Sequence, residues 1–198
     1  MPFVFKRLVL FMSIAAAFAA DKQPPFRPAP ASSYPNHQTN QQITVGVDAY
    51  ASGDKLKAAF GKLDPNEHGI LPVLVVIQND SGKALRLDRL RAGYSGAGGN
   101  KVDATPPQEV RYLRGPDRPK MIPGPTGQIK IGKGKKNPLD AWEIEGRAFS
   151  AKMLAPGQTA SGFFYFQTTL QPGSSILLNG LSEAATGKEL LYFEIPLQ

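Results

Sequence analysis

The stretch that most constrains the fold is residues 70–78, in which seven of nine side chains are aliphatic and most of those are β-branched. β-Branched side chains are stiff at χ1 and pack well on a pleated sheet, and nine residues are short for a helix. An unbroken apolar run of this length is typical of a strand that is covered on both faces. The stretch therefore predicts the central strand of a β-sandwich.

The residues that follow this run predict a turn and a second strand. Asn79 to Gly82 are residue types that bond their own backbone or tolerate a positive φ, so they favour a turn. Residues 83–90 then show a partly alternating apolar pattern. We expect residues 83–90 to form a hairpin with the central strand.

The rest of the chain predicts further short strands with one or two helices. Alternation predicts a strand over 43–51, and Leu56, Ala59, Phe60 and Leu63 share one face of a predicted helix over 55–63 with Asp54 as N-cap. Further strands are expected near Val110 and Tyr112, at 129–131, 162–168, 175–181 and 189–195, and a helix over 138–153 with a strand pair as the alternative. This pattern predicts a mainly β fold, an immunoglobulin-like antiparallel β-sandwich with one or two short helices.

The N-terminus has the pattern of an export signal. Lys6 and Arg7 precede an apolar run of 13 residues that ends in small side chains around Ala19. A membrane-spanning helix needs about 20 apolar residues, so residues 1–20 predict a cleaved signal peptide, with a short membrane anchor as the alternative. No later run is long enough to span a bilayer. We expect an exported protein, periplasmic or secreted, with no transmembrane segment in the mature chain.

Composition divides the mature chain into two parts. Residues 21–42 are rich in Pro, Gln and Asn and poor in aliphatic side chains, which predicts a flexible spacer. Residues 43–198 are expected to form a single β-sandwich domain. The chain has no cysteine, so disulfides cannot stabilise this domain, and it must be held by core packing.

Two passages carry a resemblance to a known group of proteins. Residues 154–166 contain a Pro-Gly turn followed by a glycine and an aromatic strand, and residues 71–82 contain a buried strand and a polar turn. These passages resemble those of exported bacterial immunoglobulin-like domains of unknown function. The resemblance implies the sandwich fold and an exported location, and it implies no activity. The absence of a cysteine pair and the predicted helices depart from antibody-type domains.

The clearest functional feature is a basic segment rich in glycine and proline at residues 111–137. Asp117 is its only acid, so its excess charge of +7 equals that of the whole chain. Its cations are Arg111, Arg114, Arg118, Lys120, Lys130, Lys133, Lys135 and Lys136. Such a loop suits an anionic glycolipid, an acidic polysaccharide or the acidic face of an envelope protein. The alternative is a solvated loop without a partner.

Other ligands fit this segment less well. Gly127, Gly132 and Lys133 match part of a phosphate-binding P-loop, but Gly134 stands where Ser or Thr would bind magnesium. No aromatic side chains alternate with the cations, as they do in proteins that bind single-stranded nucleic acid. We therefore expect no nucleotide cofactor and no nucleic acid.

Candidate catalytic and metal-binding residues are few. Asp64, Glu67 and His68 are close in sequence and of ligand types, but Pro65 does not suit the helix of a zinc protease. Asp140, Glu143 and Glu145 offer paired carboxylates of the kind that hydrolases use; the alternative is a solvated helix face. We expect no metal site and no cofactor. The sequence predicts a non-catalytic binding or assembly module of the bacterial cell envelope, with an exported carboxylate-based hydrolase as the alternative.

Overall fold

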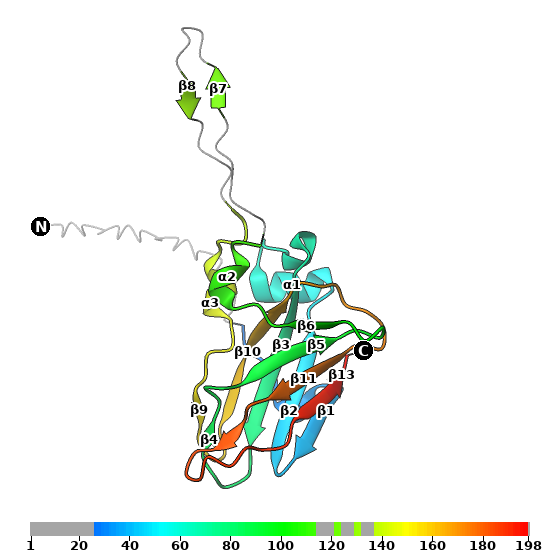
Figure 1. Ribbon diagram of the computed structural model, residues 1–198, viewed down its shortest axis with the longest axis vertical. Helices are drawn as coiled ribbons and strands as arrows, with labels where there is room; N and C mark the ends of the chain where they lie inside the picture. The colour runs from blue at the N-terminus through cyan, green and yellow to red at the C-terminus, as the bar shows by residue number, and fades with distance from the viewer. Residues whose placement is uncertain (1–25, 114–120, 124–128, 132–136, 198) are drawn as a thin grey trace, which may run out of the picture.

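The computed structural model describes residues 26–113, 121–123, 129–131 and 137–197, most of which form a mainly β structure with the two main sheets packed as a sandwich (Figure 1). All paired strands are antiparallel. The first sheet has the order β1 (Asn36–Asn40), β2 (Ile43–Ala49), β3 (Leu71–Asn79) and β10 (Thr159–Phe166). The second has the order β13 (Phe193–Pro196), β11 (Ser175–Asn179), β5 (Arg91–Ser95) and β6 (Lys101–Asp103).

Smaller elements complete the fold. A three-stranded sheet has the order β12 (Ser182–Glu183), β4 (Leu85–Arg86) and β9 (Met153–Leu154), and β7 (Met121–Pro123) pairs with β8 (Ile129–Ile131). The α-helices are α1 (Gly53–Phe60), α2 (Pro107–Val110) and α3 (Trp142–Gly146), and the 3₁₀-helices are η1 (Ala31–Ser33) and η2 (Pro65–His68). None of the helices in the described part of the chain has the length and apolar character needed to cross a bilayer.

The inner core lies between the two main sheets. On β3 the side chains of Val73, Val75 and Ile77 face this core and are fully buried. The second sheet contributes the alternate residues of its strands, among them Ile176 and Phe193. Successive side chains of a strand point to opposite faces, so these residues account for only half of β3.

The outer core covers the other face of β3. Leu74 and Val76 pack in a second buried cluster that includes Phe60 of α1, Ile144 of α3 and Phe163 of β10. The prediction of a central strand that is buried on both faces is therefore confirmed. All three α-helices α1, α2 and α3 contribute buried side chains to this second core.

Part of the predicted spacer belongs to the domain. β1 pairs with β2 along its full length, and Ala31 of η1 is fully buried. A Cβ at Gly46 of β2 would lie 2.4 Å from the backbone oxygen of Ala31, so the missing side chain lets η1 lie directly on the strand. The prediction of a flexible spacer over 21–42 is wrong for residues 31–40, because backbone pairing and close approach hold a segment that has few aliphatic side chains.

The predicted hairpin between the central strand and residues 83–90 is wrong. The two neighbours of β3 are β2 and β10, so both of its edges are occupied. Residues 85–86 form the two-residue strand β4, which pairs with β9 and β12. The turn at 79–82 therefore leads the chain away from the first sheet.

The predicted helix over 138–153 is wrong except at its centre, because the helix that forms, α3, covers only Trp142–Gly146. Ala148 bridges to Phe163 of β10, and a Cβ at Gly162 would lie only 2.4 Å from the Cα of Phe149. The chain is therefore held against β10 in an extended form. The strand-pair alternative is not observed either, because only Met153–Leu154 form a strand.

Most of the other predicted strands and the first helix are confirmed, although their ends are shifted, and the strand predicted near Val110 is wrong. The strands predicted at 43–51, 129–131, 162–168, 175–181 and 189–195 correspond to β2, β8, β10, β11 and β13. The helix predicted at 55–63 is α1, with the expected buried face, but its N-cap is Ser52 rather than Asp54. Val110 ends α2 instead of lying in a strand, since Pro107 suits the first turn of a helix.

Substitutions on β3 should affect both cores. Val75→Ala removes buried methyl groups from the inner core and Val76→Ala from the outer core, and each should lower the free energy of unfolding by about 2–4 kcal/mol. The exposed control Lys57→Ala should change it by less than about 0.5 kcal/mol. Denaturant unfolding measures the free energy of unfolding of all three variants. If it falls by less than about 0.5 kcal/mol in both valine variants, β3 is not the centre of the fold.

The buried amide of Asn79 should be needed for the turn after β3. Its Nδ2 donates to the carbonyl oxygens of Lys83, Leu154 and Ala155 at 2.8, 3.2 and 3.2 Å, and its Oδ1 accepts from Ser81 Oγ at 2.6 Å. Asn79→Asp keeps the size but places a carboxylate among three carbonyl oxygens. We expect it to destabilise the protein at pH 7 by more than Asn79→Ala, which should itself cost about 1–3 kcal/mol. Equal unfolding midpoints for the aspartate variant and the parent would contradict this role.

Candidate functional site

The predicted basic segment is only partly described by the structure. Arg111 is described fully, and Lys130 lies in β8, where it pairs with Ile122 of β7 through the backbone. Figure 1 shows the β7–β8 pair standing away from the sandwich, beyond α2 and α3. The other six predicted site residues lie outside the described residues: Arg114, Arg118, Lys120, Lys133, Lys135 and Lys136.

The two ends of this segment are joined by a hydrogen bond. Asn137 Nδ2 donates to the backbone oxygen of Arg111 at 2.7 Å, although 26 residues separate them. Asn137 Oδ1 also accepts from the backbone N–H of Leu139 at 3.0 Å, so this residue caps a turn rather than the start of a helix. We call the joined residues Arg111, Asn137, Asp140 and Glu145 the neck of the basic segment.

Ion pairs complete the neck. Arg111 Nη1 lies 2.9 Å from Asp140 Oδ1, and Arg111 Nη2 donates to Glu145 Oε1. The Arg111 side chain is about one-third exposed and its two partners are about half exposed, so solvent screens these pairs and they orient Arg111 more than they stabilise the fold. The structure therefore gives Arg111 a positioning role. Its guanidinium pairs with two of the three carboxylates that the sequence offered as catalytic candidates, Asp140 and Glu145.

The neck is fixed to the sandwich through α3. Tyr165 of β10 is fully buried, and its hydroxyl donates to the backbone oxygen of Ile144 at 2.7 Å. Burial raises the pKa of Tyr165, so this hydroxyl stays protonated and remains a donor at any physiological pH. Ile144 is buried in the outer core. The basic segment therefore begins and ends on a rigid part of the domain.

Two exposed aromatic side chains flank the neck, and sequence reasoning did not single them out. Tyr112 is 72% exposed and Trp142 is 68% exposed. The Arg111 guanidinium lies 6.0 Å from the centre of the Tyr112 ring, and that of Arg147 lies 5.8 Å from Trp142. Single exposed apolar side chains are common on protein surfaces, so these two rings matter only through their place beside the neck.

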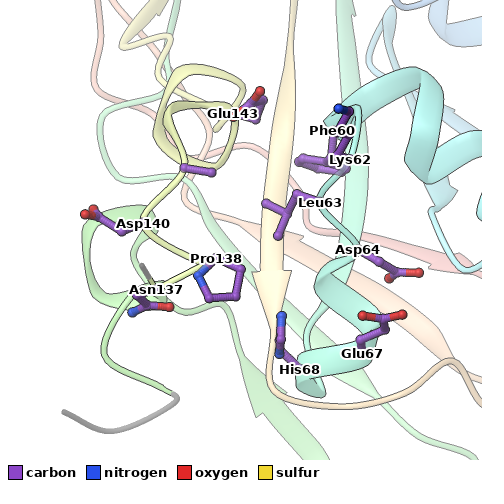
Figure 2. Close-up of a pocket in the computed structure, with 11 residues that line it drawn as sticks. Phe60, Lys62, Leu63, Asp64, Glu67, His68, Asn137, Pro138, Asp140 and Glu143 are labelled. Atoms are coloured by element: carbon purple, nitrogen blue, oxygen red, sulfur yellow. The ribbon is translucent and has the colours of Figure 1, made fainter. Parts of the chain in front are cut away.

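A groove of about 580 Å³ lies beside the neck. Figure 2 shows Asp64, Glu67 and His68 on the η2 side of this groove and Asp140 and Glu143 on the opposite side. The buried residues Phe60 and Leu63 line it between them. Acidic side chains outnumber cations here, so the groove and the basic segment have opposite charge.

The described residues do not support metal chemistry in this groove. Asp64 Oδ1 accepts from the backbone N–H of Asn66 at 2.8 Å, so it acts as the N-cap of η2. No three His, Asp or Glu side chains among the described residues are close enough together to hold a metal ion. Glu67 and Glu143 remain as carboxylates that face the groove.

The comparisons with known proteins show low similarity. No protein-family model matches the chain, and no curated protein matches its sequence. Among solved structures, the secreted protein MPT63 of Mycobacterium tuberculosis is 13% identical, with a TM-score of 0.37 over 84% of this chain and 95% of that one. A DUF4426 family protein of Pseudomonas aeruginosa is 8% identical, with a TM-score of 0.31 over 81% of this chain and 90% of that one.

A candidate lipoprotein of Bacillus subtilis is 12% identical, with a TM-score of 0.36 over 81% of this chain. The alignment covers 38% of that lipoprotein, so this chain spans about two-fifths of its length. These TM-scores are too low for the similarities to carry an argument about function.

Variants at Asn137 should separate the two hydrogen bonds of the neck. Asn137→Ala removes both bonds and should lower the free energy of unfolding by about 1–2 kcal/mol. Asn137→Asp keeps the acceptor for the Leu139 N–H but loses the donor to Arg111. Amide hydrogen exchange should therefore accelerate at Leu139 in the alanine variant and stay slow in the aspartate variant. Equal exchange at Leu139 in both variants would contradict the assignment.

Proposed function

We propose that this protein is a non-catalytic binding module of the bacterial cell envelope that contacts an anionic glycolipid through the basic segment held by the neck. The neck is the observation that carries the proposal. It joins the ends of the segment at one place on a β-sandwich, and frames of this kind commonly present loops for binding. An exported location is expected from residues 1–20.

The distribution of charge supports this proposal. Residues 114–136 contain seven cations and a single acid, whereas the whole chain has an excess of +7. The net charge of residues 114–136 is 7 − 1 = +6, so most of the excess lies in the part of the chain between the two ends of the neck. Arg111 itself is paired with Asp140 and Glu145. Clustered cations of this kind attract phosphate-rich surfaces over a distance that salt limits to about 8–10 Å.

The aromatic side chains suit a lipid surface. Tyr and Trp are enriched at the boundary between water and hydrocarbon because one end of each ring is polar and the other apolar. Tyr112 follows the first residue of the neck in the chain, Trp142 lies between its two acidic residues, and both side chains are exposed. The guanidinium of Arg147 lies 5.2 Å from the centre of the Phe26 ring and also lies over the Trp142 ring. Phe26, at the start of the described chain, therefore joins the domain close to Trp142.

The only tryptophan of the chain, Trp142, provides the test. Its fluorescence should shift to shorter wavelength when the protein is mixed with vesicles that contain an anionic glycolipid, because the ring leaves water. The shift should be absent with neutral phosphatidylcholine vesicles. It should also weaken steeply as salt is raised from 0.05 to 0.5 M, in proportion to screening of the cations.

A pair of charge-matched variants tests the role of the segment. Changing Lys130, Lys133, Lys135 and Lys136 to Ser should abolish the shift and the binding to vesicles. Changing Lys57, Arg89, Lys152 and Lys188 to Ser removes the same charge from exposed positions that do not line the groove beside the neck and should leave most of the binding. If both variants bind alike, the contact does not depend on the basic segment and the proposal fails.

A further inference from the structure

The outer face of the second sheet contains a groove of about 430 Å³ that the proposed function does not use. Its floor follows a row of directly paired residues across all four strands of that sheet. Leu177 of β11 pairs with Glu194 of β13 on one side and with Gly93 of β5 on the other, and Gly93 pairs with Asp103 of β6. The groove therefore runs across the sheet, on the face opposite the inner core.

The groove exists because residue 93 has no side chain. A Cβ built at Gly93 would meet only Asp103 Oδ1, at 3.9 Å, which is an ordinary van der Waals contact. The backbone φ of Gly93 lies outside the left-handed region, so the conformation does not require glycine. Glycine in the middle of a strand lowers stability and often marks a place where a ligand approaches closely.

The side chains around this floor combine an apolar surface with hydrogen-bonding groups. Tyr192 is 59% exposed, and together with the half-buried Leu177 it provides the apolar part. Lys101, Asp103 and Asn179 provide donors and acceptors. Among the described residues, none of these three polar side chains has a hydrogen-bond or ion-pair partner. They are therefore available to a ligand.

We propose that this groove binds a neutral oligosaccharide. A sugar ring has an apolar face, which suits the Tyr192 ring and Leu177, and a rim of hydroxyls that both donate and accept hydrogen bonds. Ligand sites usually combine apolar walls with a few placed polar groups. The lining carries both signs of charge, one cation (Lys101) and two acids (Asp103 and Glu194), and its net charge is only 1 − 2 = −1. It therefore offers no field of one sign for a strongly charged ligand, whereas sugar hydroxyls can bond to either kind of group.

The geometry assigns a role to each side of the groove. The sugar rings lie over Gly93 and Leu177, against the ring of Tyr192. The hydroxyls bond to Asn179 at one end of the groove and to Asp103 and Lys101 at the other. This site lies on β5, β6, β11 and β13, and none of its residues belongs to the neck.

The test uses two neutral probes, the hexamers of β-1,4-linked N-acetylglucosamine and of β-1,4-linked glucose, and one anionic probe, hexagalacturonate. Titration of the isotope-labelled protein should give saturable NMR shift changes with at least one neutral hexamer, at residues of β5, β6, β11 and β13. Binding of neither neutral hexamer, tighter binding of the anionic one, or shift changes confined to other elements would overturn the proposal.

Two variants test the groove directly. Gly93→Val fills the floor with a residue that suits a strand, and it should weaken the affinity for the neutral hexamer at least tenfold without lowering the unfolding temperature. Tyr192→Ala should also weaken the affinity for the neutral hexamer at least tenfold. This variant provides the test if Gly93→Val fails to fold. Tyr112→Ala removes another exposed tyrosine, which lies beside the neck and outside this groove, and should leave the affinity for the neutral hexamer unchanged. Parent-like affinity in the Tyr192 variant would overturn the assignment.

Discussion

The burial of β3 on both faces is the constraint on which the rest of the structure depends. A strand with no polar face needs a cover on each side, and the chain supplies two different covers. Val75 and its alternate neighbours are covered by a second sheet, and Val76 and its neighbours are covered by Phe60 of α1 and Ile144 of α3. The helices are therefore part of the core, and the neck inherits its rigidity from them through the Tyr165 hydrogen bond.

Features that depend on local pattern could be predicted from the sequence. The apolar run at 70–78 predicted a strand and its two-sided burial, and the alternation at 43–51 predicted β2. Features that depend on contacts between distant segments could not. Gly46 and Gly162 look like ordinary strand glycines, yet each is the place where another part of the chain crosses within 2.4 Å of an added Cβ. These crossings decide that residues 31–40 join the domain and that α3 stops early.

The same distinction applies to the candidate sites. Charge counting located the basic segment, since charge is visible in composition. It could not show that Arg111 is paired, because Asp140 and Glu145 are distant in sequence and reach it only through the packing of α2 against α3. Nor could it show that Trp142 is exposed beside the neck, because exposure depends on how α3 packs against the domain. The groove over Gly93 depends on strand pairing, which sequence alone does not reveal.

Because the neck fixes both ends of the basic segment, the segment can change in length without disturbing the sandwich. Closing a chain between fixed ends costs free energy that grows only with the logarithm of its length, about 0.6 kcal/mol for a doubling when the added residues are unstructured. The hydrogen bond from Asn137 to Arg111 joins the first and last residues of the segment and does not depend on the residues between them. The sandwich can therefore accept longer, shorter or foreign sequences between residues 113 and 137 at little cost, which makes this position suited to the display of inserted peptides.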